Sequence, residues 1–369
     1  MEGNFYFGWF FYNLICGILL FNFSRKIRIS HIRLSLGIFF LSCLALAVCG
    51  NSITADYAQY KSTISVIAST KDPFTHLEGI YVWLIHQTGD NYFLYQFIIY
   101  TYQYLICYFL VLYSLKKCKF SITFMALFAV ISLYGSISGR VYLCYITSLT
   151  GIILFFNHRW LFGSIFLILG ACLHKIGIIL TPLFLFAAII PLSFNRKKIL
   201  LLLIFGLTII VLLRYIIYTE FGNILEQISD INPTGAFYLA KEEGQNENGS
   251  LWWKLIGLYR VLFFITLSIR SLYLANKYVN PGTIIRLYFK ISFLLLFFSV
   301  IYFCLGFPDN TIGERLLSAA TIPVCIIMAK LNEHGVYALK ERRLVILGLI
   351  FLLIFNNAYI VGVSHVNQV

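Results

Sequence analysis

Charged residues are scarce in this chain of 369 residues. Lys, Arg, Asp and Glu together make up 12% of it, whereas 60% of the residues are hydrophobic and 18% are aromatic. A water-soluble domain of this length needs a far more polar surface, so the composition excludes one. The mean hydropathy is +0.84, and apolar runs near the length of a bilayer crossing recur from end to end. We therefore expect an all-α polytopic membrane protein.

The chain also lacks the short motifs that mark many soluble enzymes. Its nine cysteines show no CxxC or metal-finger spacing, and no GxGxxG, Walker, HExxH or GxSxG motif is present. We interpret the cysteines as small core side chains, and we expect no metal, no cofactor and no nucleotide chemistry. The net charge of +13 is spread over short loops. Because it is not gathered on one soluble face, we do not expect nucleic acid as a partner.

The apolar runs predict about twelve transmembrane helices in a single integral membrane domain over 1–369. The first run begins without a charged segment or a small-residue cleavage site, which predicts a retained helix and not a signal peptide. The predicted helices are at about 5–23, 34–50, 91–115, 120–136, 141–156, 160–173, 176–192, 199–219, 254–275, 288–306, 315–331 and 344–363.

The loops between these helices alternate in charge. One set, which includes 25–33, 195–198 and 330–343, is rich in Lys and Arg. The other set includes two long segments, 51–90 and 220–253, and carries nearly all the acidic residues. By the positive-inside rule the first set is cytoplasmic, so both long segments and both termini are predicted to be external.

The second half of segment 51–90 has apolar residues at a helical spacing. They predict one helix that lies at the membrane interface, with an apolar face formed by Leu77, Ile80, Tyr81, Leu84 and Ile85.

Ionisable residues on the external side are candidates for function, because a charge at the edge of the hydrocarbon is costly. Arg140, in "YGSISGRVYLCYI", precedes an external-side helix. Its guanidinium and the free N–H groups of that helix together suit a phosphate. The alternative is an interfacial arginine that extends its guanidinium to water.

Further candidates lie at the ends of other predicted helices. His174 and Lys175 occupy a tight external turn, where Lys175 can hold a diphosphate and His174 can donate or relay a proton, unless the turn is only a polar hairpin tip. Glu314 and Arg315 open a late helix, and they can equally pair with each other. Asp56 can act as a general base, or it can simply cap a helix or be solvated.

These stretches resemble the EpsG family, a group within the Wzy-type polymerases of O-antigen and exopolysaccharide. The resemblance covers about 50–330. It rests on Asp56, Tyr57 and Tyr60 in "DYAQY", and on the stretches "DPFTHLEGIYVWL", "SISGRVYLCYI", "LHKIGIILTP" and "ERLLSAA". The second, third and fifth stretches match the family pattern loosely.

The resemblance implies a metal-independent glycosyltransferase of GT-C-like architecture in the bacterial inner membrane, with its active site facing the periplasm. It would transfer a growing glycan from undecaprenyl diphosphate to a lipid-linked acceptor sugar, producing O-antigen, capsule or exopolysaccharide. The implied partners are these glycans, membrane lipids and a separate chain-length regulator protein.

The charges suggest roles for the candidate residues in such a reaction. Arg140 and Arg315 would hold the diphosphate with help from Lys175. Asp56 or, second, His174 would act as the base. We group Tyr57, Tyr60 and Glu314 with the substrate-binding residues.

Two other functions stay open at this stage. A flippase or transporter of lipid-linked oligosaccharides would need a cation-lined cavity that reaches both leaflets. The candidate charges gather on the external side, which favours chemistry there. A membrane O-acyltransferase would need a histidine near the cytoplasmic face or in mid-membrane. His31, His158 and His334 lie in basic cytoplasmic loops and have no acidic neighbour except Glu333.

Overall fold

The computed structural model describes seven continuous stretches of the chain: 57–70, 78–114, 139–174, 176–189, 251–278, 284–304 and 311–333, together with isolated positions beyond them. Within these stretches the structure is helical and contains no strand. The helices are α3 (Tyr57–Ser69), α4 (Gly79–Thr88), α5 (Tyr92–Ser114), α7 (Gly139–Phe156), α8 (Trp160–Leu173), α9 (Gly177–Ile189), α12 (Leu251–Tyr278), α13 (Ile284–Cys304) and α14 (Thr311–Glu333).

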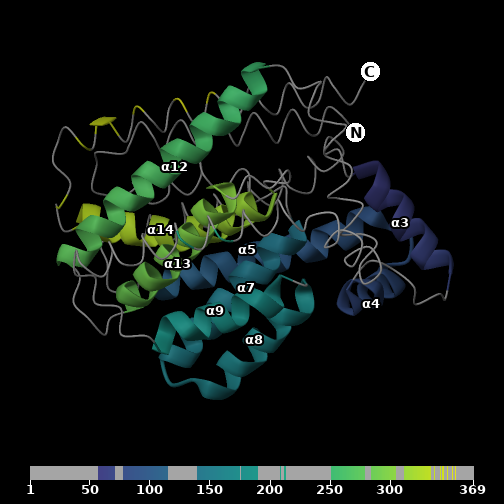
Figure 1. Cartoon of the computed structure of the whole chain (residues 1–369). Helices are drawn as coiled ribbons and strands as arrows, with labels where there is room; N and C mark the ends of the chain where they lie inside the picture. Colours follow the sequence, from purple (N-terminus) through teal and green to yellow (C-terminus); the bar gives the residue numbers. More distant parts are fainter. Residues whose placement is uncertain are drawn as a thin grey trace.

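Helix α7 lies at the centre of the described bundle (Figure 1). It contacts α5, α8, α9 and α14, while α13 and α14 form a second antiparallel pair that also touches α12. All residues from Val141 to Leu149 are buried. The short helices α3 and α4 lie together at one end of the bundle, near the N-terminal end of α7 (Figure 1).

Small residues bring α7, α8 and α9 into close contact. A Cβ atom at Gly151 would come within 2.8 Å of the backbone nitrogen of Leu167, and one at Gly163 would come within 2.8 Å of the backbone nitrogen of Phe155. A Cβ atom at Gly177 would meet the carbonyl oxygen of Gly170 at 2.5 Å. Glycine at these positions lets the helix backbones approach closely, as in many membrane bundles.

The turn between α7 and α8 is short and well bonded. The amide N–H of Arg159 donates to the carbonyl of Leu154 at 2.9 Å, and the Asn157 side chain donates to the carbonyl of Ile153 at 2.6 Å. His158 has φ 61°, the left-handed conformation common where a helix ends. This turn makes α7 and α8 antiparallel neighbours.

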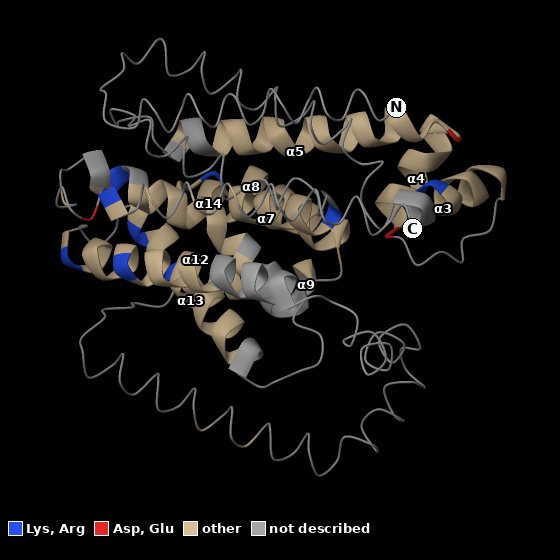
Figure 2. Cartoon of the chain, turned by 90° about the horizontal axis from the view of Figure 1, so that it is seen from above, with Lys and Arg blue, Asp and Glu red and all other residues tan. Residues whose placement is uncertain are grey.

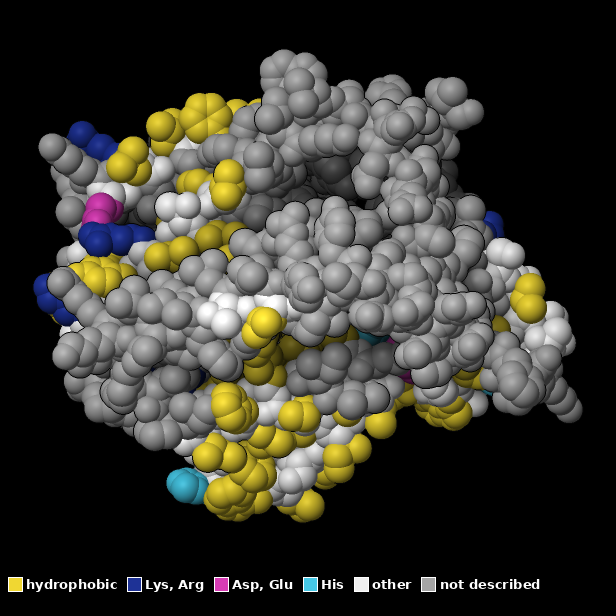
Figure 3. Space-filling model, viewed as in Figure 1, with side chains coloured by type: hydrophobic (Ala, Val, Ile, Leu, Met, Phe, Trp, Pro, Cys, Tyr) yellow, Lys and Arg dark blue, Asp and Glu magenta, His cyan; other side chains and the backbone are white. Residues whose placement is uncertain are grey.

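Two of the described helices are long and apolar enough to cross a membrane, at Tyr92–Leu110 and Ile284–Ile301. Other apolar helices are shorter, among them Arg140–Phe156 and Trp160–Leu173. Hydrophobic side chains also gather on the surface formed by α8 and α9, at the bottom of Figure 3. They include the exposed side chains of Trp160, Leu161, Phe162, Ile165 and Ile168. Such a surface is consistent with a membrane protein.

Most predicted helices that fall in the described stretches are confirmed within a few residues. The ranges 91–115, 141–156, 160–173, 176–192, 254–275, 288–306 and 315–331 correspond to α5, α7, α8, α9, α12, α13 and α14. The ranges 5–23, 34–50 and 120–136 lie outside the described residues, as do 199–219 and 344–363 except for isolated positions. The number of twelve therefore stays a prediction.

The segment 51–90, predicted to be external, contains two helices where the sequence predicted one. The predicted interface helix is α4, whose Tyr81 and Ile85 are buried. Helix α3 was not predicted. Its Ile64 and Ile67 are each 1% exposed. Because α3 contacts α4, these two residues extend the hydrophobic core of the bundle to this end.

Candidate active site

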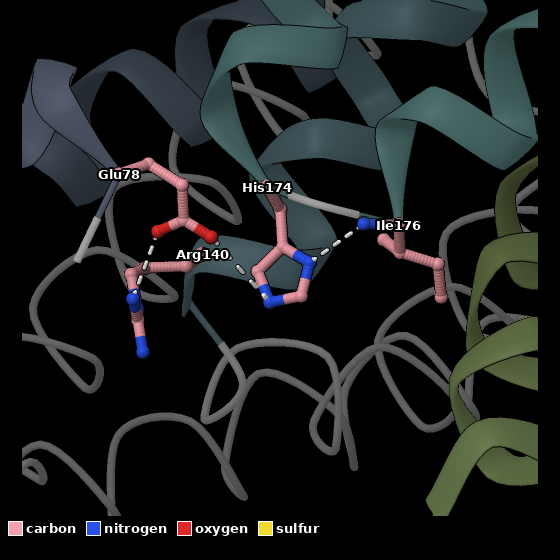
Figure 4. Close-up of polar contacts among 4 residues, drawn as sticks. All are labelled: Glu78, Arg140, His174 and Ile176. Atoms are coloured by element: carbon pink, nitrogen blue, oxygen red, sulfur yellow. Dashed lines mark hydrogen bonds and ion pairs between the residues drawn. The ribbon is translucent and has the colours of Figure 1, made fainter. Parts of the chain in front are cut away.

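Three polar side chains from distant parts of the sequence meet at the end of the bundle where α3 and α4 lie. Nη1 of Arg140 is 3.0 Å from Oε2 of Glu78, and Nε2 of His174 is 4.0 Å from Oε1 of the same carboxylate. Figure 4 shows the carboxylate between the two basic groups. We call Glu78, Arg140 and His174 the polar cluster.

Each member of the cluster stands at the end of a helix. Glu78 directly precedes α4, where its carbonyl accepts the amide N–H of Tyr81 at 2.9 Å. Arg140 is the second residue of α7, and His174 directly follows α8 with extended backbone. The packing of α7 on α8 therefore brings Arg140 and His174 together, and α4 adds Glu78.

The turn after α8 holds His174 through two backbone contacts. Its Nδ1 accepts the amide N–H of Ile176 at 3.2 Å, and its carbonyl accepts the amide N–H of Gly177 at 2.8 Å. Gly177 opens α9 against the backbone of Gly170 and Ala171. The imidazole is thus attached to a close contact between α8 and α9, which limits its movement.

The ring of Tyr81, on α4, also contacts Arg140. The guanidinium carbon of Arg140 lies 5.7 Å from the centre of the Tyr81 ring, within range of a cation–π contact. Tyr81 is 1% exposed, and among the described residues its hydroxyl has no hydrogen-bond partner. Burial raises the pKa of Tyr81, and the nearby Tyr95 adds to that rise while Arg140 opposes it. The phenol therefore stays protonated at neutral pH.

The cluster is shielded but still reachable. The side chains of Arg140, His174 and Glu78 are 23%, 18% and 12% exposed. Shielding from water strengthens the attraction between such charges. The remaining exposure leaves a route by which a polar ligand can reach them.

This arrangement suits anion binding and proton transfer more than metal binding. A guanidinium offers planar N–H donors to phosphate oxygens, and a carboxylate can accept a proton. The cluster contains one carboxylate and one imidazole, and no group of three His, Cys, Asp or Glu that could hold a metal ion occurs among the described residues.

The other predicted site residues are only partly described. Asp56 and Lys175 lie outside the described residues. Tyr57 and Tyr60 lie in α3, and Glu314 and Arg315 lie in α14, but the positions of these four side chains are not among those described. Because α14 begins at Thr311, Arg315 is the fifth residue of its helix and does not open it.

Sequence reasoning missed Glu78. It counted this residue among the external acids and assigned it no role. A signal was present, because Glu78 stands in "DPFTHLEGIYVWL", just before a helix with apolar spacing. What the sequence could not give is the contact with Arg140, 62 positions further along the chain.

Comparison with known proteins identifies the family of the chain. The model of the EpsG family matches residues 33–368, which is nearly its whole length. The chain belongs to the EpsG family. EpsG-like proteins are Wzy-type polymerases, so the family indicates a glycosyltransferase-like role in polysaccharide polymerisation. No curated protein and no solved structure matches the chain significantly. The polar cluster of this EpsG-family protein lies inside the matched range.

Proposed function

We propose that this protein polymerises oligosaccharide repeat units carried on undecaprenyl diphosphate. The growing glycan is transferred to the sugar of a new lipid-linked unit, and undecaprenyl diphosphate leaves. The product is O-antigen, capsule or exopolysaccharide. The observation that carries the proposal is the polar cluster, a shielded Arg140–Glu78–His174 arrangement at one end of an apolar helical bundle, in a chain of a polymerase family.

The charge of the leaving group explains why arginine suits this site. As the bond to the sugar breaks, negative charge grows on the diphosphate. A guanidinium held in a partly dry site stabilises that charge more in the transition state than in the ground state. Arg140 has this role in the proposal, and Arg315 and Lys175 assist it. In the proposal these three cations, and not a metal ion, compensate the charge of the leaving group.

The proposal also includes the setting of the reaction. The chain crosses the bacterial inner membrane about twelve times in a GT-C-like arrangement, with the polar cluster on the periplasmic side. The distribution of Lys and Arg supports this orientation. Most of those drawn in Figure 2 lie near α12, α13 and α14, at the end of the bundle that is far from α3 and α4. By the positive-inside rule that basic end is cytoplasmic. A separate chain-length regulator is a proposed partner.

The test is polymerisation by the purified protein. Wild type is given synthetic undecaprenyl-diphosphate repeat units from its own source strain, and the products are separated by size. We expect a ladder of glycans. Arg140→Lys is expected to lower the ladder rate strongly, because an ammonium group is a point charge without the planar fork of donors. Arg270→Lys is the matched control, since Arg270 pairs with Glu341 elsewhere.

The alternative function gives a different result. If wild type makes no ladder and instead moves the lipid-linked unit from one vesicle leaflet to the other, the protein is a flippase and the polymerase proposal is wrong.

A further inference from the structure

Glu78 is the member of the polar cluster to which the predicted mechanism gave no role. Its carboxylate is the least exposed of the three side chains, at 12%. Arg140 of α7 and His174 after α8 lie at its two oxygens, and Tyr81 of α4 and Cys144 of α7 are near enough to be influenced by its charge. A carboxylate in this position needs a reason, because it competes with a diphosphate for Arg140.

The three side chains of the cluster differ in their ability to accept a proton. A guanidinium has donors only. A neutral imidazole has one nitrogen with a lone pair, and the other nitrogen carries a hydrogen. In His174 the lone pair belongs to Nδ1, because Nδ1 accepts the amide N–H of Ile176 at 3.2 Å. We assign the hydrogen to Nε2 from this contact.

The nitrogen of His174 that faces the site is therefore a donor. Nε2 lies 4.0 Å from Oε1 of Glu78 (Figure 4), which is too long for a hydrogen bond but close enough for attraction. To accept a proton at Nε2, the ring would have to move its hydrogen to Nδ1 and lose the contact with Ile176. Within the polar cluster, the proton acceptor is left to Glu78.

We propose that Glu78, and not His174, accepts the proton of the acceptor sugar's hydroxyl. This inference rests on the proposed polymerase function. The acceptor oxygen forms a bond to the anomeric carbon of the growing glycan, and the bond from that carbon to the diphosphate oxygen breaks. The bonding electrons leave with undecaprenyl diphosphate, and the hydroxyl proton passes to the carboxylate of Glu78.

The contact with Arg140 links this proton transfer to the departure of the leaving group. Before transfer, the charge of Arg140 is opposed by Glu78 at 3.0 Å. When Glu78 takes the proton, that negative charge disappears at the moment when charge grows on the diphosphate. The attraction between Arg140 and the leaving group therefore rises in the transition state, which is where added attraction increases the rate. His174 turns its Nε2–H toward the carboxylate at 4.0 Å, and this attraction helps to position Glu78.

The experiment compares substitutions that keep shape but change proton affinity. Glu78→Gln keeps a carbonyl oxygen for Arg140 and removes the proton acceptor. We expect kcat for ladder growth to fall by about 10²- to 10⁴-fold, the usual contribution of a general base. We expect the KM for the lipid-linked donor to change by less than about threefold, since donor binding is kept. The acidic limb of the pH–kcat profile should disappear. Glu78→Asp should keep that limb at a lower rate.

The controls separate this role from a structural one. Glu341→Gln makes the same change in the Arg270–Glu341 pair and should leave activity unchanged. His174→Gln should slow the reaction but keep the acidic limb. If Glu78→Gln keeps the limb and His174→Gln loses it, the base is His174 and the inference is wrong. A raised donor KM with an unchanged pH profile would make Glu78 only a support for Arg140 and would equally overturn it.

The failures of the two proposals can be told apart. A wild-type ladder together with full activity of Glu78→Gln rejects the role of Glu78 and keeps the polymerase. A wild type that makes no ladder rejects the polymerase, and the role of Glu78 is rejected with it.

Discussion

The described part of the molecule contains two Arg–Glu pairs whose surroundings differ. Arg140 and Glu78 are 23% and 12% exposed, and a histidine and a buried tyrosine adjoin them. Arg270 and Glu341 are 50% and 28% exposed. Nε of Arg270 donates to Glu341 at 3.0 Å. The same two residue types thus make a similar bond in a shielded and in an open setting.

The difference teaches that the bond alone does not mark a site. An exposed pair gains little, because water screens both charges and the long side chains lose freedom. A shielded pair interacts more strongly, and removing one partner leaves the other charge without compensation. Arg140 is adjoined by Glu78 and Tyr81, and the packing of α7 against α8 and α9 places His174 on the same carboxylate. A substitution that loosens this packing should therefore make the Arg140–Glu78 pair behave more like the exposed pair.

The largest effect on stability is expected from Gly177→Ala. The new Cβ atom would lie 2.5 Å from the carbonyl oxygen of Gly170 and 2.8 Å from Cα of Ala171. Both are backbone atoms, so α8 and α9 must separate, at a cost of about 1–3 kcal/mol in the free energy of unfolding. The turn that holds His174 would shift, so ladder growth should slow as well. Thermal unfolding in detergent and the ladder assay measure the two effects.

Gly79→Ala is the matched control for this change. Nothing lies within 4 Å of a Cβ atom at Gly79, which is the first residue of α4. The variant should unfold at the wild-type temperature or slightly above it, because alanine favours a helix over glycine by up to about 1 kcal/mol. Equal stability of Gly177→Ala and Gly79→Ala would show that the α8–α9 contact does not support the site.

The helices themselves could largely be predicted from sequence, since each is a local pattern. Helix α8 was predicted at its observed bounds because polar residues, Arg159 and His174, flank an apolar run. Helix α3 was missed because its buried positions, Ile64 and Ile67, stand among Ser and Thr, which favour helices weakly. Short amphipathic helices of this kind depend on tertiary packing.

The candidate site was predicted in part. Arg140 and His174 were identified because an ionisable residue between apolar runs is unusual. Glu78 was not, because its importance lies in a contact between residues 62 positions apart. The choice between Nδ1 and Nε2 of His174 was also beyond the sequence, since it depends on the backbone N–H of Ile176. Local patterns give elements and candidates, whereas the pairing of side chains needs the packed structure.

The next largest effect is expected in the interaction energy between Arg and Glu within each of the two pairs. A double-mutant cycle with Glu78→Ala and Arg140→Ala isolates the interaction energy of the shielded pair from other losses. We expect about 1–2 kcal/mol, between the values of exposed and fully buried pairs. The same cycle on Glu341 and Arg270 should give less than about 0.5 kcal/mol, because those side chains are more exposed, at 28% and 50%.

Salt sharpens this second comparison. At 1 M salt the coupling of the exposed pair should vanish, whereas that of the shielded pair should persist in part. Unfolding of the six variants and wild type in the same detergent measures both couplings. If the two pairs have equal interaction energies at low salt, shielding from water does not strengthen the Arg140–Glu78 pair.

The smallest effect is expected at Tyr81, whose ring lies against Arg140 at 5.7 Å. Tyr81→Leu removes the aromatic face and should destabilise the protein by about 0.5–1 kcal/mol beyond the loss of packing. Tyr81→Phe keeps the face, and the hydroxyl that it removes has no hydrogen-bond partner among the described residues. Its unfolding temperature should therefore match wild type. Arg140→Ala provides the background in which the ring has no cation to contact. If Tyr81→Leu costs as much there as in wild type, the ring supports α4 by packing alone and does not help to hold Arg140 beside Glu78.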